Sequence, residues 1–508
     1  MSLNQLSSMV FVAAVVSGCG ANESASTATT EPSATNTTNT TTETQTSQVT
    51  DVSPVTTVSV SDNPTLVLEK IVDIELSAPN ALAVACTRVG LESEVHLLES
   101  AVNAAHTLRF AGLVAETTYN CVVGTPEKPG QAVHSFEMTT DALPNRIPEG
   151  SVTEGGFGKM VGAYTLFTSQ MLCEDDLNIH LVLVGPEGEV RWYYALPLQG
   201  YADMGAEYYG DGQFLWGGVS GTGNAEGAPH LVTVSHEEVY VAQYPESQSV
   251  PFHHMCEAAD DGSVLTLVEE MARDGAREFT GFGIHHVDIE NDSLLWSWSV
   301  QEAIDRGQLQ ANGVWDYGGN WTGSMNDGVE EVMVVSLCDV MSIIAVSKNT
   351  GDVAWSMAPW GSLDLTDGSY AECTHGLDVR GNRLLAYDNG WEGPSSRVVE
   401  YEIDGAAQEA TQVWSWTEPN WHEYVWGDVD YLGEDHVLLN RGHLECYSGG
   451  NGPSQIVEID KTNDEVIWRL ALEDDRVGTY GADRIDGCEI FSDVRWCEGL
   501  TSRLSELN

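Results

Sequence analysis

The chain has 508 residues, too many for one ordinary hydrophobic core, so we expect two or more domains. It carries 77 acidic and 21 basic residues, and a surface with a formal net charge of −56 repels phosphate backbones. Nucleic-acid binding is therefore excluded, and hydration under salt is the preferred explanation of the acidic composition. The 50 glycines and 15 tryptophans favour strands and turns over a helical bundle.

The N-terminus, MSLNQLSSMVFVAAVVSGC, is typical of a bacterial lipoprotein signal, although it has no Lys or Arg before the apolar run. That run, Met9 to Val16, ends in small residues followed by Cys19. We predict a signal peptide over residues 1–18 and lipid attachment at Cys19. The run is too short to span a bilayer, so membrane contact is expected through the lipid anchor only. This places the protein in a bacterial cell envelope, either periplasmic or on the outer-membrane surface.

Residues 19–63 are rich in Ser and Thr and contain almost no large apolar side chain. A segment of this composition cannot bury enough apolar surface to order itself. We therefore predict a disordered tether, whose root-mean-square reach is on the order of 35 Å.

Residues 64–143 alternate in short apolar runs such as LAVACTRV, HTLRFAGL and TTYNCVVG. Tyr119 stands two residues before Cys121, which is the tyrosine-corner arrangement of Ig-like sandwiches, and Cys86 would be the disulfide partner on the facing sheet. The segment resembles Ig and fibronectin type III domains. We predict a small β-sandwich that serves for spacing or contact.

Residues 155–497 repeat with a period of roughly 50 to 60 residues, which is the range of propeller blades. The repeat is visible in strands that end in a tryptophan, and one unit has Val241 in its place. The tryptophans are Trp192, Trp296, Trp355, Trp414 and Trp468. The sequence therefore predicts an all-β chain with a six-bladed propeller after the sandwich, and a tail over 498–508.

Each repeat opens with a short polar phrase, a Gly/Asp turn and an apolar strand. Aligned on that turn, the leading positions are Gly205, His254, Gly323, His375, Gly427 and Gly481. The first strand of a blade borders the central channel, so residues at one repeat phase form a ring around the axis. His254 and His375 are therefore predicted to line a concave site, the alternative being that they only hydrogen-bond neighbouring backbone. The doublet His285–His286 lies within a blade strand and is given no role.

The chain has ten cysteines, and removing Cys19 as the lipidated residue leaves an odd number. No CxxC or Cys/His pattern has zinc spacing, so no metal site is predicted. After Cys86 and Cys121, the next pair that we expect to be bonded is Cys488 with Cys497.

Residues 160–495 resemble the bacterial arylsulfotransferases in the phrases FHHMCEAADDGSVLTL, THGLDVRGNRLLAYDNG, SSRVVEYEID and TGDVAWSM. The resemblance implies a six-bladed propeller behind an N-terminal sandwich. It also implies transfer of a sulfuryl group from an aryl sulfate to a phenol, without a cofactor, through a sulfated histidine. His375 matches the position of the family's nucleophile, and His254, with His253 beside it, matches a histidine that binds the sulfuryl oxygens.

The chain departs from the family pattern at two positions. Gly323 stands where the family has a histidine, and Cys338 stands near its arginine. Arg441 is the candidate that would supply the missing cation. The alternative function is therefore a catalytically impaired propeller that binds a small ligand or a protein partner of unknown identity.

Overall fold

A computed structural model describes residues 53–156, 159–171, 179–197, 204–218, 228–248, 250–259, 261–275, 277–309, 319–338, 341–391, 393, 395–442, 453–485 and 490–491. These residues are nearly all in strands and the turns between them. One α-helix, α1 (Val300–Asp305), and a 3₁₀ turn, Pro245–Gln248, are the helical segments among them.

The N-terminal strands belong to one hydrogen-bonded sheet. Its members are β1 (Val55–Asp62), β2 (Lys70–Arg88), β3 (Leu91–Phe110), β4 (Thr118–Gly124) and β5 (His134–Thr139). The long β2 pairs with β1 over its first half and with β4 over its second half, while β3 follows it along both halves. Because β2 and β3 take part in both halves, the strands form one continuous sheet, and a sandwich in this region stays a prediction.

Two boundaries differ from those expected from composition. Val55–Asp62, inside the predicted tether, is the strand β1, because its alternating valines pair with the start of β2. The segment between the predicted domains contains β6 (Gly150–Glu154), which pairs with β30.

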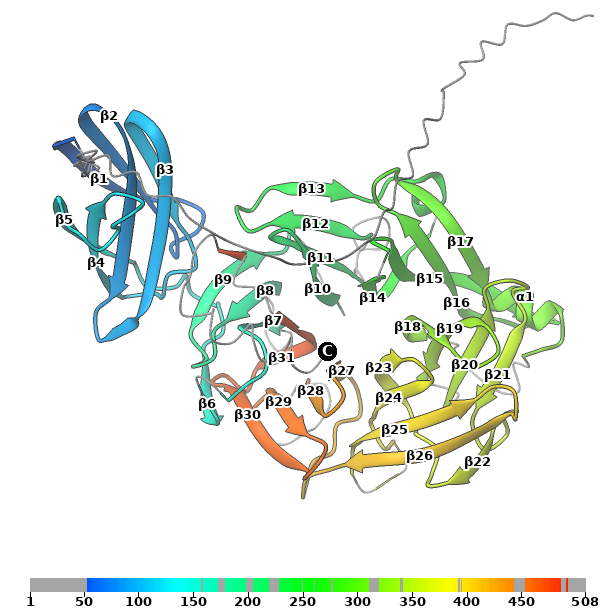
Figure 1. Cartoon of the computed structure of the whole chain (residues 1–508). Coiled ribbons are helices and arrows are strands. Elements are labelled where there is room, and N and C mark those ends of the chain that lie inside the picture. The colour runs from blue at the N-terminus through cyan, green and yellow to red at the C-terminus, as the bar shows by residue number, and fades with distance from the viewer. Residues whose placement is uncertain are drawn as a thin grey trace, which may run out of the picture. The chain divides into compact units, whose positions relative to one another are not determined.

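The rest of the described chain forms six further sheets that follow one another around a common centre (Figure 1). From the inner strand outward, three of them are β10 (Met204–Gly210), β11 (Gln213–Gly218), β12 (His230–Thr233) and β13 (Glu238–Val241); β14 (Phe252–Ala258), β15 (Val264–Asp274), β16 (Arg277–Asp288) and β17 (Ser293–Ser299); and β18 (Gly319–Asn326), β19 (Glu331–Leu337), β20 (Ser342–Ser347) and β21 (Val353–Met357).

The next two sheets have a fifth strand on their outer edge. They are β23 (Thr374–Arg380), β24 (Arg383–Asp388), β25 (Arg397–Asp404), β26 (Glu409–Trp416) and β22 (Asp364–Asp367); and β27 (Asp428–Leu432), β28 (His436–Arg441), β29 (Gln455–Asp460), β30 (Glu465–Leu472) and β6. The last sheet joins distant parts of the chain: β31 (Val477–Ile485), β7 (Tyr164–Met171), β8 (Ile179–Val184) and β9 (Val190–Ala195). Its inner strand, β31, comes from the C-terminal part and pairs with β7, which closes the ring.

The repeating tryptophans lie on the fourth strand of their sheets, and several bond the next sheet along the ring. The indole of Trp192 donates to the carbonyl of Val234 at 2.8 Å, and that of Trp468 donates to the carbonyl of Pro186 at 2.8 Å. Trp296 and Trp414 reach the next sheet in the same way. The apolar ring system fills the space between sheets while its N–H finds a partner, which explains why the period is marked by tryptophan.

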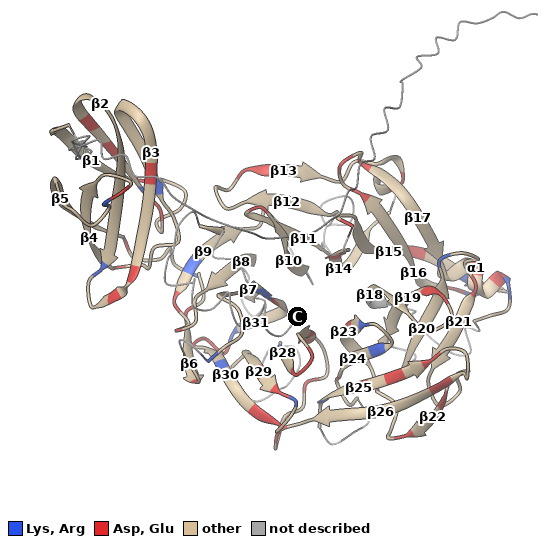
Figure 2. Ribbon diagram, in the orientation of Figure 1, with Lys and Arg blue, Asp and Glu red and all other residues tan. Residues whose placement is uncertain are grey.

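Acidic residues are spread over the strands of the N-terminal sheet and of the ring, and they outnumber the basic ones (Figure 2). Among the described residues, no helix is long and apolar enough to cross a membrane.

Candidate functional site

The inner strands β14 and β23 each begin with an irregularity that places a histidine. In β14 the register with β15 shifts between His253 and Cys256, and His254 has a left-handed backbone with φ of 57°. In a regular strand His253 and His254 would point to opposite faces. The bulge instead brings their rings together, edge to face, with centroids 3.7 Å apart. This local geometry explains the histidine doublet.

His375 lies in the corresponding irregularity of β23, where the register with β24 shifts between Thr374 and Leu377. Its side chain is buried, and Nδ1 is 2.8 Å from Oδ1 of Asn389. The amide nitrogen of Asn389 donates to the carbonyls of Glu423 and Trp426 at 3.0 and 2.9 Å. Since the amide uses its N–H groups there, Oδ1 must accept, so Nδ1 of His375 carries the proton and Nε2 has the lone pair.

Burial keeps both histidines of these inner strands, His254 and His375, uncharged. It lowers the pKa of His375 to about 4, although the bond to Asn389 acts in the opposite direction. Burial also lowers the pKa of His254 to well below its usual value, and the neighbouring His253 and His375 lower it further. The two residues are therefore near enough to interact electrostatically, and a shared site between them stays a prediction. The ring of Tyr480, on β31, stacks on His254 with centroids 5.6 Å apart.

Arg441 does not supply a cation to these histidines. Its guanidinium lies 3.1 Å from Glu418 and 3.4 Å from Glu423, and it packs over the ring of Trp421. Both carboxylates come from the connection between β26 and β27, whose position could not be predicted from the repeat pattern. The role suggested for Arg441 in binding the sulfuryl group therefore has no geometric support. His253, in turn, lies 3.4 Å from the carboxylate of Glu269.

A disulfide bond stands where the family resemblance led us to expect an arginine. Cys338, directly after β19, is bonded to Cys373, directly before β23, with Cα atoms 3.7 Å apart. The sulfur of Cys373 is 3.7 Å from Nδ1 of His375. The sequence showed Cys338 as a departure from the family but gave no sign of its partner, because the two residues meet only when neighbouring sheets pack.

The two sulfurs and the imidazole also lie close enough together to consider a metal site. A ligand atom from each of Cys338, Cys373 and His375 lies within 4.8 Å of the other two. In the bonded form, however, neither sulfur is a thiolate, which is the form that binds metals. The arrangement as it stands is a bridge beside a histidine.

A layer of half-buried carboxyl groups lies on the inner strands of the ring. Its members are Glu207, Glu257, Asp378, Asp428, Asp430 and Asp483, from five inner strands, and the negative charge of neighbouring members raises the pKa of most of them. Burial is the largest cause of each shift, and it raises the pKa of Asp378 and of Asp483 to about 6 and that of Asp428 to about 7. We call this set the axial acidic layer.

Several members of the axial acidic layer fasten one sheet to the next. Asp378 accepts from the backbone N–H of Tyr431 at 2.7 Å, and Asp483 accepts from that of Tyr208 at 2.9 Å. Glu207 accepts in the same way from Ala258. Each acid sits on one inner strand and each donor on the following one, so these side chains close the ring around its axis.

The remaining predicted site residues fall elsewhere. Cys19, Cys488 and Cys497 lie outside the described residues. Cys86 and Cys121 are bonded, with Cα atoms 4.0 Å apart, but they sit directly opposite each other on the adjacent strands β2 and β4. The bridge therefore lies within one sheet instead of joining two facing sheets, because β2 is long enough to reach β4.

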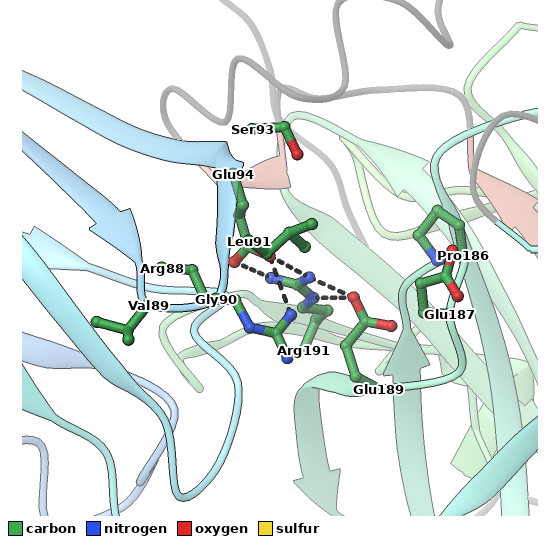
Figure 3. Close-up of a pocket in the computed structure, with 10 residues that line it drawn as sticks. All are labelled: Arg88, Val89, Gly90, Leu91, Ser93, Glu94, Pro186, Glu187, Glu189 and Arg191. Carbon is green, nitrogen blue, oxygen red and sulfur yellow. Dashed lines mark hydrogen bonds and ion pairs between the residues drawn. The ribbon is translucent and has the colours of Figure 1, made fainter.

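A hollow of about 520 Å³ is lined by residues of the N-terminal sheet and by residues of β9 and the turn before it (Figure 3). Arg191 stands between Glu94 and Glu189, and its guanidinium bonds both oxygens of Glu94 at 2.7 and 3.0 Å. Burial opposes ionisation of Glu94, but bonds from His96 and the charge of Arg191 outweigh it and hold its pKa well below the usual range. The charged groups here already pair with each other, which favours a structural role.

No curated protein matches this chain. Solved structures similar to it include a variant of the Synechocystis apocarotenoid oxygenase, 11% identical over 65% of this chain and 82% of that one, with a TM-score of 0.34. The β-propeller domain of Cps50 (Swd1) from Myceliophteria thermophila is 7% identical over 64% and 98%, with a TM-score of 0.34. Apo AztD from Citrobacter koseri is 10% identical over 79% and 96%, with a TM-score of 0.24.

One family matches a part of the chain that belongs to the site. The match begins two residues after His375 and ends one residue after Tyr480. It includes Asn389, Arg441 and three members of the axial acidic layer, Asp378, Asp428 and Asp430. Over residues 377–481 the chain is similar to the family described as Arylsulfotransferase (ASST).

Proposed function

We propose that the chain is an arylsulfotransferase-like lipoprotein with a six-bladed propeller, which transfers a sulfuryl group from an aryl sulfate to a phenol. The observation that carries the proposal is the uncharged His375, whose Nδ1–H is held by Asn389 next to a segment similar to this family. A histidine attacks only through an unprotonated nitrogen. With a pKa of about 4, His375 has one at neutral pH.

In the first step, Nε2 of His375 forms a bond to sulfur while the bond between sulfur and the aryl oxygen breaks. The electron pair of that bond leaves with the phenolate, and the imidazole becomes positively charged. The Nδ1–H bond to Asn389 strengthens as that charge develops, so it stabilises the transition state more than the ground state.

In the second step, the oxygen of the acceptor phenol bonds to sulfur, and the electron pair of the N–S bond returns to Nε2. The acceptor loses its proton and the released donor phenolate gains one, so the reaction is balanced without a cofactor. His254 would donate a hydrogen bond to the sulfuryl oxygens. The ring of His253 packs edge to face against that of His254 and would hold it in place.

Two exposed aromatic residues suit the aryl groups of donor and acceptor. Trp391 is 41% exposed and Tyr424 is 43% exposed. They lie on two loops that are joined beside His375, since Asn389 donates to the carbonyl of Glu423 and His422 bonds the carbonyl of Gly390 at 3.2 Å. Aromatic rings stack on aryl substrates at little entropic cost. We propose that these residues contact the substrate rings.

The test is release of phenol from a chromogenic aryl sulfate, measured with and without a phenolic acceptor. Transfer predicts little release without acceptor and sustained release with it, because the sulfated histidine waits for a second phenol. His375→Ala should abolish turnover, and His254→Ala should slow it about a hundredfold or more.

The matched control for those variants is His285→Ala. His285 is also buried, and its pKa is also lowered to about 4, but it lies on another strand, β16. Its Nδ1 is 2.8 Å from the hydroxyl of Tyr244. Its loss should affect stability and leave turnover unchanged. A wild-type protein that does not cleave any of several aryl sulfates would contradict the proposal that the chain is an enzyme.

The second candidate function is a propeller that binds a small ligand or a protein partner without turnover. It is favoured by Gly323, which has no side chain that could donate a hydrogen bond to a sulfuryl group. It is also favoured by Arg441, whose guanidinium forms ion pairs with Glu418 and Glu423. An aryl sulfate that binds, in calorimetry, to wild type but not to His254→Ala, without being cleaved, would identify this function.

We also propose that the protein is anchored in a bacterial cell envelope through a lipid on Cys19. The support is the sequence of residues 1–19. Mass spectrometry of the mature N-terminus tests this: a chain that begins at diacylated Cys19 is expected, and a chain that retains residues 1–18 would contradict it.

A further inference from the structure

The disulfide between Cys338 and Cys373 joins two sheets at the place where His375 is held. Cys338 follows the second strand of one sheet, β19, and Cys373 precedes the inner strand of the next, β23. Both cysteines are buried, and Cys373 has a left-handed backbone with φ of 49°. The bond therefore fixes the position from which β23 starts, two residues before His375.

The bridge also controls what faces Nδ1 of His375. The sulfur of Cys373 is 3.7 Å from Nδ1, while Oδ1 of Asn389 is 2.8 Å from it. A disulfide sulfur has neither a proton nor a charge, so the Nδ1–H bond goes to Asn389. A free thiol at the same place has an S–H group, which can donate a hydrogen bond to an unprotonated Nδ1 and so favours the tautomer of His375 that carries its proton on Nε2.

We propose that the Cys338–Cys373 disulfide is a positioning pair for His375 and that its reduction switches transfer off. The proposal rests on the proposed function of His375. A dithiol opens the bridge by thiol–disulfide exchange: two electrons pass to the two sulfurs, Cys338 and Cys373 each take a proton, and the dithiol becomes a disulfide. The S–H of Cys373 then donates a hydrogen bond to Nδ1 of His375, while the proton of Nδ1 is lost to solvent and Nε2 gains one, and a protonated Nε2 cannot attack sulfur.

Reduction should therefore lower kcat about 10- to 100-fold, the usual effect of losing a group that orients a reactive histidine. KM for the aryl sulfate should change little, since the bridge lies on the Nδ1 side of His375 and not at the Nε2 that attacks sulfur. The imidazole proton of His375 should move from Nδ1 to Nε2, which nitrogen-15 chemical shifts of the ring distinguish. Reoxidation should restore all three quantities.

The experiment treats the folded full chain with a dithiol and follows opening of each bridge by alkylation and mass spectrometry. The matched control is the Cys86–Cys121 bridge, which also has a sequence separation of 35 but joins adjacent strands of one sheet. The Cys86→Ala/Cys121→Ala variant should keep the full dithiol response. The Cys338→Ala variant, which leaves Cys373 as a thiol, should behave as the reduced protein does without any dithiol.

A second readout does not depend on turnover: the tautomer of His375, from the nitrogen-15 chemical shifts of its imidazole before and after reduction. If transfer is absent but the tautomer changes on reduction, the proposed function fails and the positioning role stands. If transfer is present and an opened Cys338–Cys373 bridge changes neither kcat nor the tautomer, the positioning role is overturned. Because the dithiol acts on protein that is already folded, a variant that fails to fold does not remove the test.

Discussion

Replacing Asn389 with alanine tests which group holds His375 in its reactive form. The side chain of Asn389 is fully buried and makes three hydrogen bonds: one to Nδ1 of His375 and two to the carbonyls of Glu423 and Trp426. The variant leaves His375 free to rotate or to carry its proton on Nε2. Either change removes the lone pair that attacks sulfur.

The size of the effect follows from the charge that develops on the imidazole. A hydrogen bond to a charged group contributes about 1.5–3 kcal/mol, and about 1.36 kcal/mol corresponds to a tenfold change in rate. Asn389→Ala should therefore lower kcat about 10- to 100-fold with a smaller change in KM. Asn389→Asp should instead raise the pKa of His375 and move the acid limb of the pH–rate profile upward, since a carboxylate stabilises the imidazolium.

The assay is turnover of a chromogenic aryl sulfate with saturating phenol, measured between pH 4 and pH 9 and combined with thermal unfolding. The control is Asn440→Ala, because Asn440 is also buried but bonds Thr479, through contacts of 2.6 and 3.2 Å, instead of a histidine. Both variants should lose stability, and only Asn389→Ala should lose turnover beyond that. A kcat within about twofold of wild type for Asn389→Ala, or equal losses in both variants, would refute the assignment of the His375 tautomer.

Three further outcomes follow from buried charges. Because the pKa of Asp428 is about 7 in the folded protein and about 4 when unfolded, the folded state binds more protons between those values. Its contribution to stability is therefore complete below about pH 4 and is lost as the pH rises toward 7, and Asp428→Asn should flatten this slope in urea unfolding. Arg441→Gln should lower the midpoint of thermal unfolding while leaving kcat unchanged, because the guanidinium of Arg441 forms ion pairs with two carboxylates and not with the histidines. Arg191→Met should lower the free energy of unfolding by about 3 kcal/mol at most, since it removes the two-bond partner of the buried Glu94 and leaves that carboxylate with Arg88 and His96, and Glu94→Gln in the same chain should recover part of that loss.

The repeat was predictable because its physical cause is local. The tryptophans of the fourth strands recur at the blade period, and each large ring fills the same gap between neighbouring sheets, so the pattern survives in the sequence. Alignment of the repeats also put His254 and His375 at one phase. In the structure His375 contributes to the lowered pKa of His254, so the two residues lie near each other, while their roles stay predictions. The repeat phase of such positions can be found by counting along the chain.

The partners of these residues were not predictable, because they depend on how sheets meet. Asn389 was inside a phrase that resembled the family, DNG, but nothing in that phrase says that its amide faces His375. Cys373 precedes His375 by two residues, and its bond to Cys338 forms only when β19 and β23 lie side by side. The acids of the inner strands were likewise present in the aligned phrases. Their raised pKa values come from the other strands, which no single repeat contains.

The axial acidic layer should give substrate binding a pH dependence that differs from that of the chemical step. Glu257 lies three residues after His254, and Asp378 lies three residues after His375. Each carboxyl is therefore within about 10 Å of a histidine along the strand. An aryl sulfate brings a negative charge into this site, and ionised carboxyls below the histidines repel it. As the pH rises through about 6 to 7, the layer loses its protons, and KM for the donor should rise while kcat, which depends on the already neutral His375, stays level. Asp428→Asn should reduce the rise in KM, and high salt should reduce it too. A KM that is constant from pH 5 to pH 8 would mean that the layer acts only to join the sheets.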